Sequence, residues 1–132
     1  MGISNKFRAS SEKTIEGVWV DLGDGLKVRV AHMKNPRYQE ALERLLKPHR
    51  VAMKTNTLPD DVVEAAVVEA MAEAILLDWQ GDEVAYSKAA AVAYLGNPET
   101  REFRDVIAAL AKDFELFRAE YEAAAEKNLP TA

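Results

Sequence analysis

Side chains suited to catalysis or metal binding are sparse in this sequence. The chain has two histidines, His32 and His49, and no cysteine. No third ligand stands at metal-binding spacing near either histidine, so we interpret both as structural or surface residues. The lack of cysteine excludes disulfide scaffolds, thiolate zinc sites, iron–sulfur clusters and cysteine nucleophiles. The sequence therefore predicts neither a metal site nor a cofactor site.

Carboxylates and a glycine-rich segment offer two further possibilities for chemistry. The 22 Asp and Glu residues fall mostly on predicted solvent faces, where they solubilise a protein more often than they form acid–base pairs. The segment Gly23-Asp24-Gly25 could cradle a phosphate, but neither a Walker-type lysine nor a helix follows it. We therefore predict that it is a turn. We expect no catalytic residue and no enzymatic activity.

Size and charge narrow the class of protein. A chain of 132 residues makes one domain, and 48% hydrophobic residues can fill its core. The net charge of −5 is divided unevenly, with +4 over residues 1–50 and −9 over residues 51–132. The acidic larger part argues against nucleic-acid binding. No stretch reaches the roughly 20 apolar residues that span a bilayer, so we expect a cytoplasmic protein without a membrane partner.

Alternating apolar residues predict a β-hairpin over residues 14–32. The glycine turn lies at its centre, and an isolated hairpin would need helices to cover its aliphatic face. Trp19 falls on the opposite face, beside Lys27 and Arg29. There it either stacks on these cations or meets the N-terminal arm, or it serves as a binding anchor for a partner. The alternating apolar positions are Val18, Val20, Leu22, Leu26, Val28 and Val30.

Helical signals occupy residues 36–126. Asn35-Pro36 and Asn97-Pro98 each begin a helix, and Ser87 and Gly96 bound a short helix between them. Another helix begins near Pro59 and runs to about Trp79. Its predicted buried face comprises Val63, Val67, Ala70, Ala74 and Leu77. The sequence thus predicts an α+β, mostly α fold, in which an N-terminal β-hairpin packs on four to five helices.

Charged residues should link the first two long helices. Pro48 should bend or end the helix that starts at Pro36. Basic residues then gather just ahead of the acidic helix that follows. We expect most of them to pair across a helical hairpin or to face solvent. They are Lys34, Arg37, Arg44, Lys47, Arg50 and Lys54.

The final predicted helix carries the most regular apolar pattern in the chain. The pattern is too short for a free-standing coiled coil, so it needs a groove or an adjacent helix. We interpret it mainly as core packing, with Phe117 and Tyr121 available to a partner helix. Around the helices we predict a flexible arm over 1–13, one globular domain over 14–126 and a frayed tail over 127–132. The apolar positions are Phe103, Ile107, Leu110, Phe114, Phe117 and Tyr121.

Several segments, taken in order, resemble a tail assembly chaperone family of long-tailed bacteriophages. The likeness spans roughly residues 14–121. The loop over 82–85 is short for this family, and Ala85 stands where its pattern has proline. The matching segments are Glu16-Gly17-Val18-Trp19-Val20-Asp21, Gly23-Asp24-Gly25, Asn35-Pro36-Arg37-Tyr38, Leu45-Leu46-Lys47-Pro48, Leu76-Leu77-Asp78-Trp79-Gln80-Gly81, Tyr86-Ser87 and Glu102-Phe103-Arg104-Asp105.

The resemblance implies a binding protein without enzymatic activity. Such chaperones coat the tape measure protein in the host cytoplasm and are absent from the finished tail. Contact with the tail tube protein and assembly into a homo-oligomer are further expectations. We expect partner contacts at Trp19, Phe114, Phe117 and Tyr121. Two alternatives stay open: a structural virion component such as a connector or tail completion subunit, and a regulatory or antitoxin-like protein whose basic segment over 34–54 contacts nucleic acid.

Overall fold

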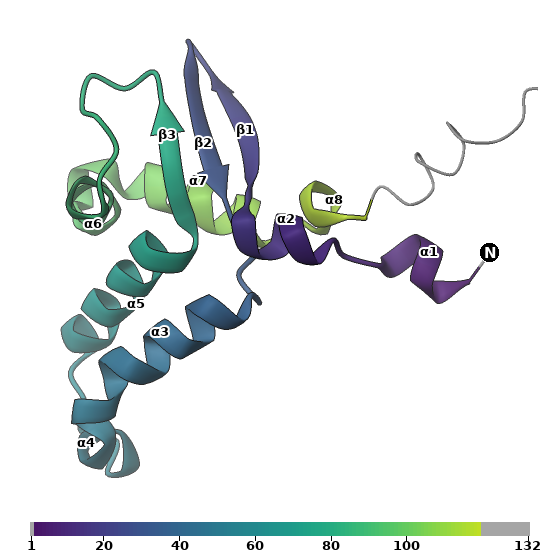
Figure 1. The fold of residues 1–132 in the computed structure, drawn as a ribbon. Coiled ribbons are helices and arrows are strands. Elements are labelled where there is room, and N and C mark those ends of the chain that lie inside the picture. The colour runs from purple at the N-terminus through teal and green to yellow at the C-terminus, as the bar shows by residue number, and fades with distance from the viewer. Residues whose placement is uncertain (1, 120–132) are drawn as a thin grey trace, which may run out of the picture.

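The computed structural model describes residues 2–119 and confirms the predicted α+β, mostly α class (Figure 1). A small sheet carries helices on one face, and a pair of helices extends away from it. In chain order the elements are α1 (Ile3–Phe7), α2 (Ser11–Glu16), β1 (Val18–Gly23), β2 (Leu26–Val30), α3 (Pro36–Leu46), a 3-10 turn (Lys47–His49), α4 (Arg50–Lys54), α5 (Asp60–Ala74), β3 (Leu76–Gln80), α6 (Lys88–Gly96), a 3-10 turn (Pro98–Thr100), α7 (Arg101–Lys112) and α8 (Phe114–Phe117).

The sheet is built on the predicted hairpin. β1 and β2 pair antiparallel, with Trp19 opposite Arg29, and β3 adds to the free edge of β2 in the order β1-β2-β3. The turn over 23–25 has φ values of 89°, 54° and 80°. Glycine adopts such left-handed angles without steric cost, and an aspartate tolerates them better than most residues. The prediction of a turn at this segment is confirmed.

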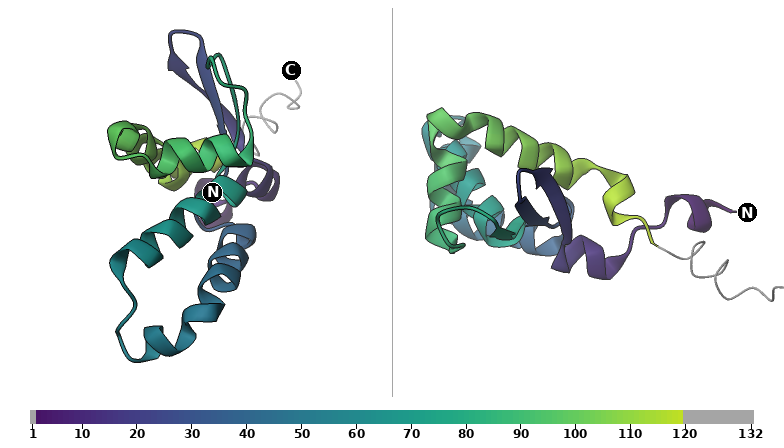
Figure 2. Two further views of the ribbon diagram at one scale, coloured as in Figure 1. Left: turned by 90° about the vertical axis from the view of Figure 1, so that its left-hand side faces the viewer. Right: turned by 90° about the horizontal axis from the view of Figure 1, so that it is seen from above.

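Within residues 2–119, helices cover one face of the sheet and leave the other open. α6 and α7 lie across that face, whereas α3 and α5 run antiparallel away from the sheet and meet at α4 (Figures 1 and 2). The core lies where the aliphatic face of β2 and β3 meets α5, α6 and α7. Its largest fully buried apolar side chains are Val28, Val30, Ile75, Leu76, Leu95 and Ile107, and Phe117 of α8 is fully buried against His32. None of the helices within residues 2–119 has both the length and the apolar character needed to cross a membrane.

The predicted capping signals begin and end the helices as expected. The Asn35 side chain accepts a hydrogen bond from the Tyr38 amide at 3.1 Å, and the Ser87 hydroxyl accepts one from the Ala90 amide at 3.0 Å. These side chains satisfy amides that the first helical turn leaves without a partner. α3 ends immediately before the turn that contains Pro48.

The helix predicted over 59–79 is wrong for its last five residues, 75–79. α5 ends at Ala74, and the chain continues as β3, which pairs Leu76 with Val30 and Trp79 with Val28. The edge of β2 needs hydrogen-bond partners, and β3 supplies them while burying its own apolar residues. Of the buried face predicted for this helix, Ala70 and Ala74 are buried, whereas Val63 is exposed. Helical spacing along one segment could not reveal a distant strand partner.

The predicted hairpin begins later than expected. α2 covers residues 11–16, so the first strand starts at Val18 rather than at residue 14. The Ser10 side chain caps α2, which explains the helix in this segment. The arm predicted over 1–13 holds α1 and the start of α2, and Ala9 forms an antiparallel bridge with Arg118.

The final helix is also shorter than predicted. α7 ends at Lys112, and Asp113 leaves helical geometry with φ −80° and ψ 100°. Its carboxylate then accepts a hydrogen bond from the Glu115 amide at 3.1 Å and caps α8. The apolar pattern therefore crosses a break between two helices. Tyr121, the predicted helical residues up to 126 and the predicted tail over 127–132 lie outside the described residues.

Candidate functional site

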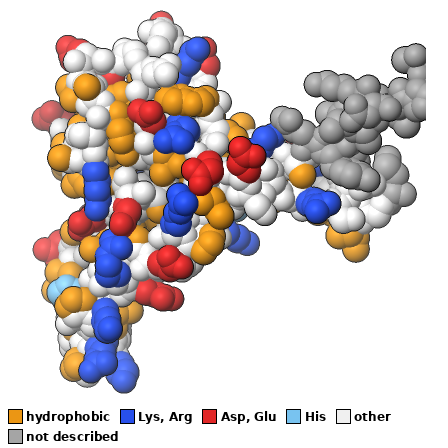
Figure 3. Space-filling view, viewed as in Figure 1, with side chains coloured by type: hydrophobic (Ala, Val, Ile, Leu, Met, Phe, Trp, Pro, Cys, Tyr) orange, Lys and Arg blue, Asp and Glu red, His pale blue; other side chains and the backbone are white. Residues whose placement is uncertain are grey.

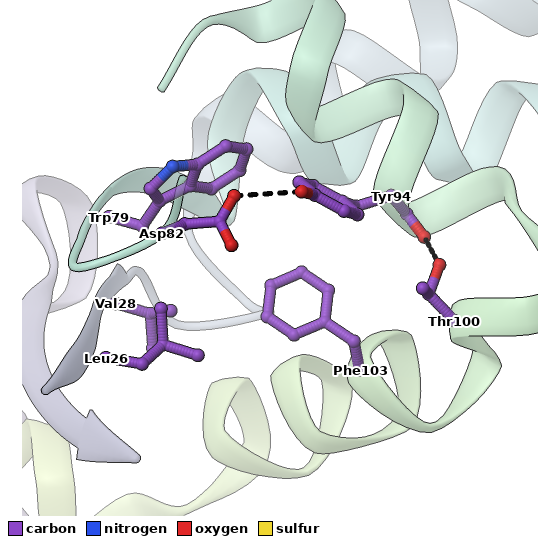
Figure 4. A pocket seen from close by; sticks show the side chains of 7 residues that line it. All are labelled: Leu26, Val28, Trp79, Asp82, Tyr94, Thr100 and Phe103. Carbon is purple, nitrogen blue, oxygen red and sulfur yellow. Dashed lines mark hydrogen bonds between the residues drawn. The ribbon is translucent and has the colours of Figure 1, made fainter. Parts of the chain in front are cut away.

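An apolar pocket opens between the sheet and α6–α7. It has a volume of about 190 Å³. β2, the end of β3, the loop that follows it, α6 and the start of α7 position its lining residues (Figure 4). These residues are Leu26, Val28, Trp79, Asp82, Tyr94, Thr100 and Phe103.

Three of the residues that line the pocket are aromatic. Trp79 and Tyr94 meet edge to face at a centroid distance of 5.5 Å, and Tyr94 and Phe103 at 6.1 Å. Trp79 also meets Tyr86 edge to face at 4.9 Å, and its indole nitrogen donates to the Val84 carbonyl at 2.7 Å. The polar atom of Trp79 is therefore satisfied by the loop.

Asp82 provides the one carboxylate in this wall. Its Oδ2 atom accepts hydrogen bonds from the Tyr94 hydroxyl at 2.8 Å and from the Val84 amide at 3.1 Å. The hydrogen bond to Asp82 raises the pKa of Tyr94, and burial and the negative charges of Asp82 and Glu83 act in the same direction. Figure 4 shows the second carboxylate oxygen turned toward Phe103.

A close backbone contact fixes the loop that carries Asp82. Gly81 has φ of 90°, and a Cβ atom built on it would lie 2.1 Å from the Gly25 carbonyl oxygen. Only glycine can occupy this position without moving the backbone. The loop after β3 thus lies directly against the turn after β1, and Asp82 follows Gly81 into the pocket wall.

Trp19 lies on the face of the sheet that α6 and α7 leave uncovered. Its side chain is 45% exposed, and its cross-strand neighbour Arg29 donates from Nη1 to the Glu16 carbonyl at 3.1 Å. The prediction that Trp19 points away from the aliphatic core face is confirmed. Whether it anchors a partner stays a prediction.

The other predicted contact residues lie in α8 or outside the described residues. Phe114 is half-buried, with the Arg118 guanidinium 5.0 Å from its ring. Phe117 is fully buried and meets His32 edge to face at 4.9 Å. The expectation that its side chain lies on the surface, where a partner helix could reach it, is wrong. The break at Asp113 separates Phe117 from α7, and Phe117 is buried in the short helix α8 that follows. Tyr121 lies outside the described residues.

His32 has the structural surroundings that we predict for it. Its Nδ1 atom accepts a hydrogen bond from the Lys34 amide at 3.0 Å. Burial lowers the pKa of His32, and the charge of Lys34 acts in the same direction. Within residues 2–119, no group of three or more His, Asp or Glu side chains could hold a metal ion.

Ion pairs join the helices around the core. Glu64 on α5 accepts from Arg104 at 2.5 Å and from Arg101 at 3.0 Å, and these cations lower its pKa. Arg44 on α3 pairs with Glu73 on α5, which raises the pKa of Arg44 and lowers that of Glu73. The predicted pairing across a helical hairpin is therefore present at Arg44. Other Lys and Arg side chains lie on the exposed surface of α3 and α4, the helices that extend away from the sheet (Figure 3).

Sequence reasoning did not identify the pocket. Trp79, Tyr94 and Phe103 lie on three different elements, β3, α6 and α7, and Trp79 reaches the pocket from a strand that pairs with β2. The available signal was a series of aromatic residues on both sides of an acidic loop. Without β3, that series gave no reason to place the three rings together.

A family model described as YdaY prophage protein matches residues 33–128. The match covers most of the chain. The chain belongs to the YdaY prophage protein family. This membership confirms the predicted phage origin, and the matched region contains every pocket residue except those of β2. Comparisons with curated proteins and with solved structures gave no match.

Proposed function

We propose that this YdaY family member is a phage tail assembly chaperone. It binds the helices of the tape measure protein in the host cytoplasm, keeps them dispersed until the tail tube forms around them, and is absent from the finished tail. It acts by binding alone, without catalysis or a cofactor. The prophage family match supports a role of this kind in a phage.

The observation that carries the proposal is the number of large apolar side chains on the surface. Phe7 is 61% exposed, Val51 69% and Met53 49%, in addition to Trp19. They lie on α1, α4 and the uncovered face of the sheet, so they are presented in several directions. Large contiguous apolar patches mark protein–protein contact sites, whereas each of these separate residues would offer a partner only a small contact. Several weak contacts along one long partner also raise the total affinity.

The charge of the chain supports the same role. The net charge is −5, and the exposed apolar residues stand among charged side chains (Figure 3). A charged exterior keeps a complex with an apolar partner in solution, because like-charged complexes repel one another. The pocket adds a concave apolar site that a side chain from a partner helix can enter.

Co-expression with the long helical protein of the same prophage tests the proposal. Wild-type protein should raise the soluble fraction of that protein and purify with it. Trp19→Ser should weaken the effect, whereas Gln80→Ser, an exposed change on the same face of the sheet, should not. An unchanged soluble fraction with wild-type protein would contradict the proposal.

Analysis of purified phage particles separates the chaperone from a structural virion component. A chaperone should be found in lysates of induced cells and be missing from finished particles. A fixed number of copies in each particle would instead establish a connector or tail completion subunit.

A further inference from the structure

One oxygen of a carboxylate in the pocket has no partner among the described residues. The Tyr94 hydroxyl and the Val84 amide both donate to the Oδ2 atom of Asp82. No described residue donates to its Oδ1 atom. The free oxygen is turned into the pocket toward Phe103 (Figure 4). The pocket therefore presents one negative atom inside an otherwise apolar wall.

This arrangement disfavours a purely apolar guest. Such a guest would remove water from the free oxygen and leave it without a hydrogen-bond donor, which is costly for a charged group. A cationic guest supplies both a donor and an opposite charge. The faces of Trp79, Tyr94 and Phe103 also attract a cation, because aromatic rings carry negative charge density on their faces.

A second acidic residue lies next to Asp82 in the loop. Glu83 follows Asp82 in the loop, and no Lys or Arg is among the lining residues. The pKa of Tyr94 is raised in part by the charges of both acids, which indicates that their negative potential reaches the pocket wall. A cation entering the pocket would meet no opposing charge from these residues.

We propose that the pocket receives the side chain of a lysine presented by a helix of a protein partner. The alkyl chain lies against Leu26 and Val28, and the ammonium group lies among the aromatic rings and donates to Oδ1 of Asp82. That the partner is the tape measure protein rests on the proposed function, whereas the preference for an ammonium group rests on the pocket alone.

Volume and hydrogen-bond geometry favour lysine. A cavity of about 150 Å³ accepts benzene, which is comparable in size to the alkylammonium part of lysine, and this pocket measures about 190 Å³. Arginine presents a planar fork that prefers two acceptor atoms, whereas an ammonium group is a compact charge that a single oxygen and ring faces can hold. Only one oxygen of Asp82 is open.

The binding chemistry can be tested with n-butylammonium as a probe for the lysine side chain. In a Trp19→Phe background, Trp79 is the one remaining tryptophan, so the tryptophan fluorescence reports on the pocket. The indole N–H signal of Trp79 in NMR spectra gives a second readout. We expect saturable changes with n-butylammonium and much weaker changes with 1-butanol, its neutral counterpart. Equal binding of the two probes, or no saturation with n-butylammonium, would overturn the proposal.

Two substitutions keep the shape of the pocket and change its chemistry. Asp82→Asn retains an oxygen for Tyr94 and Val84 but removes the charge, and should weaken n-butylammonium binding about tenfold. Phe103→Leu retains apolar volume but removes a ring face, and should also weaken binding. Thermal melts of both variants establish that they fold.

Asp24→Asn is the matched control for charge. Asp24 lies in the turn that contacts the loop of Asp82, and asparagine tolerates its left-handed backbone equally well. This variant should bind n-butylammonium like the wild type. An equal loss in the Asp24 and Asp82 variants would mean that general electrostatic attraction, not the pocket, holds the probe.

A helical peptide with a single lysine distinguishes a protein partner from a free amine. The peptide should displace n-butylammonium, and its norleucine counterpart should not. Binding of n-butylammonium that the lysine peptide does not displace would overturn the proposal that the pocket receives a lysine side chain.

The inference and the proposed function can fail separately. If the probe and peptide bind but co-expression with the tape measure protein gives no complex, the proposed function fails and the inference stands. If that complex forms equally well with Asp82→Asn, the inference fails and the function stands.

Discussion

The side-chain amide of Asn35 donates a hydrogen bond to the Ala74 carbonyl at 3.2 Å and so joins the start of α3 to the end of α5. Asn35 is fully buried, donates also to the His32 carbonyl, and caps α3 through its oxygen. One side chain therefore connects three segments that enclose the core.

Asn35→Ala should lower the free energy of unfolding by about 2–4 kcal/mol, because it removes a helix cap and leaves a buried carbonyl without its donor. Asn97→Ala is the matched control. Asn97 also precedes a proline and caps a helical turn, but it is exposed, so its loss should cost about 1 kcal/mol. Urea unfolding measures both values, and equal losses would show that the link to Ala74 contributes little.

Gly81→Ala should be far more damaging than Gly25→Ala. Both glycines have positive φ, but a Cβ on Gly81 would collide with the Gly25 carbonyl, whereas one on Gly25 meets nothing within 4 Å. We expect a loss of about 1–2 kcal/mol for Gly25→Ala from backbone strain alone, and a larger loss for Gly81→Ala. Thermal unfolding compares the two, and a similar melting temperature would contradict the close approach of the two loops.

The stability of the protein should fall as the pH drops below 6.5, the ordinary pKa of histidine. Burial holds the pKa of His32 below this value in the folded protein. The unfolded chain therefore takes up a proton first, and stability present above pH 6.5 is lost as the pH falls toward the lower folded pKa.

His32→Asn isolates this contribution. Asparagine can still accept from the Lys34 amide but does not titrate, so urea midpoints measured between about pH 7.5 and pH 5 should change less than in the wild type. His49→Asn controls for removal of a histidine elsewhere. A wild-type slope retained in the His32 variant would assign the pH dependence to other groups.

Trp19 and Phe117 should respond to substitution in opposite ways. Phe117→Ala empties a fully buried site and should cost about 3–5 kcal/mol of stability. Trp19→Ser changes a side chain that is 45% exposed and should cost about 1 kcal/mol or less. Its effect should appear instead in the amount of tape measure protein kept soluble. A Trp19 variant that is stable and fully active would remove this residue from the binding surface.

Local signals in the sequence were sufficient for the hairpin and for the starts of the longer helices. The alternation around Gly23–Gly25 and the Asn35-Pro36 cap depend on neighbouring residues, so they can be read without the rest of the fold. β3 could not be predicted this way, since Trp79 lies in a strand only because β2 offers it an edge. The pocket depended on that same pairing. The break at Asp113 was hidden because apolar spacing continues across it in Phe114 and Phe117.

The bridge between Ala9 and Arg118 has a practical consequence. The Ser10 amide donates to the Phe117 carbonyl at 2.7 Å, and the Ala119 amide donates to the Arg8 carbonyl at 2.9 Å, so the two ends of the described chain leave at one corner. A fluorescent label attached at Ala9 or at Arg118 would crowd the same side of the molecule. The turn between α4 and α5 lies away from that corner and is the better position for a reporter (Figure 1).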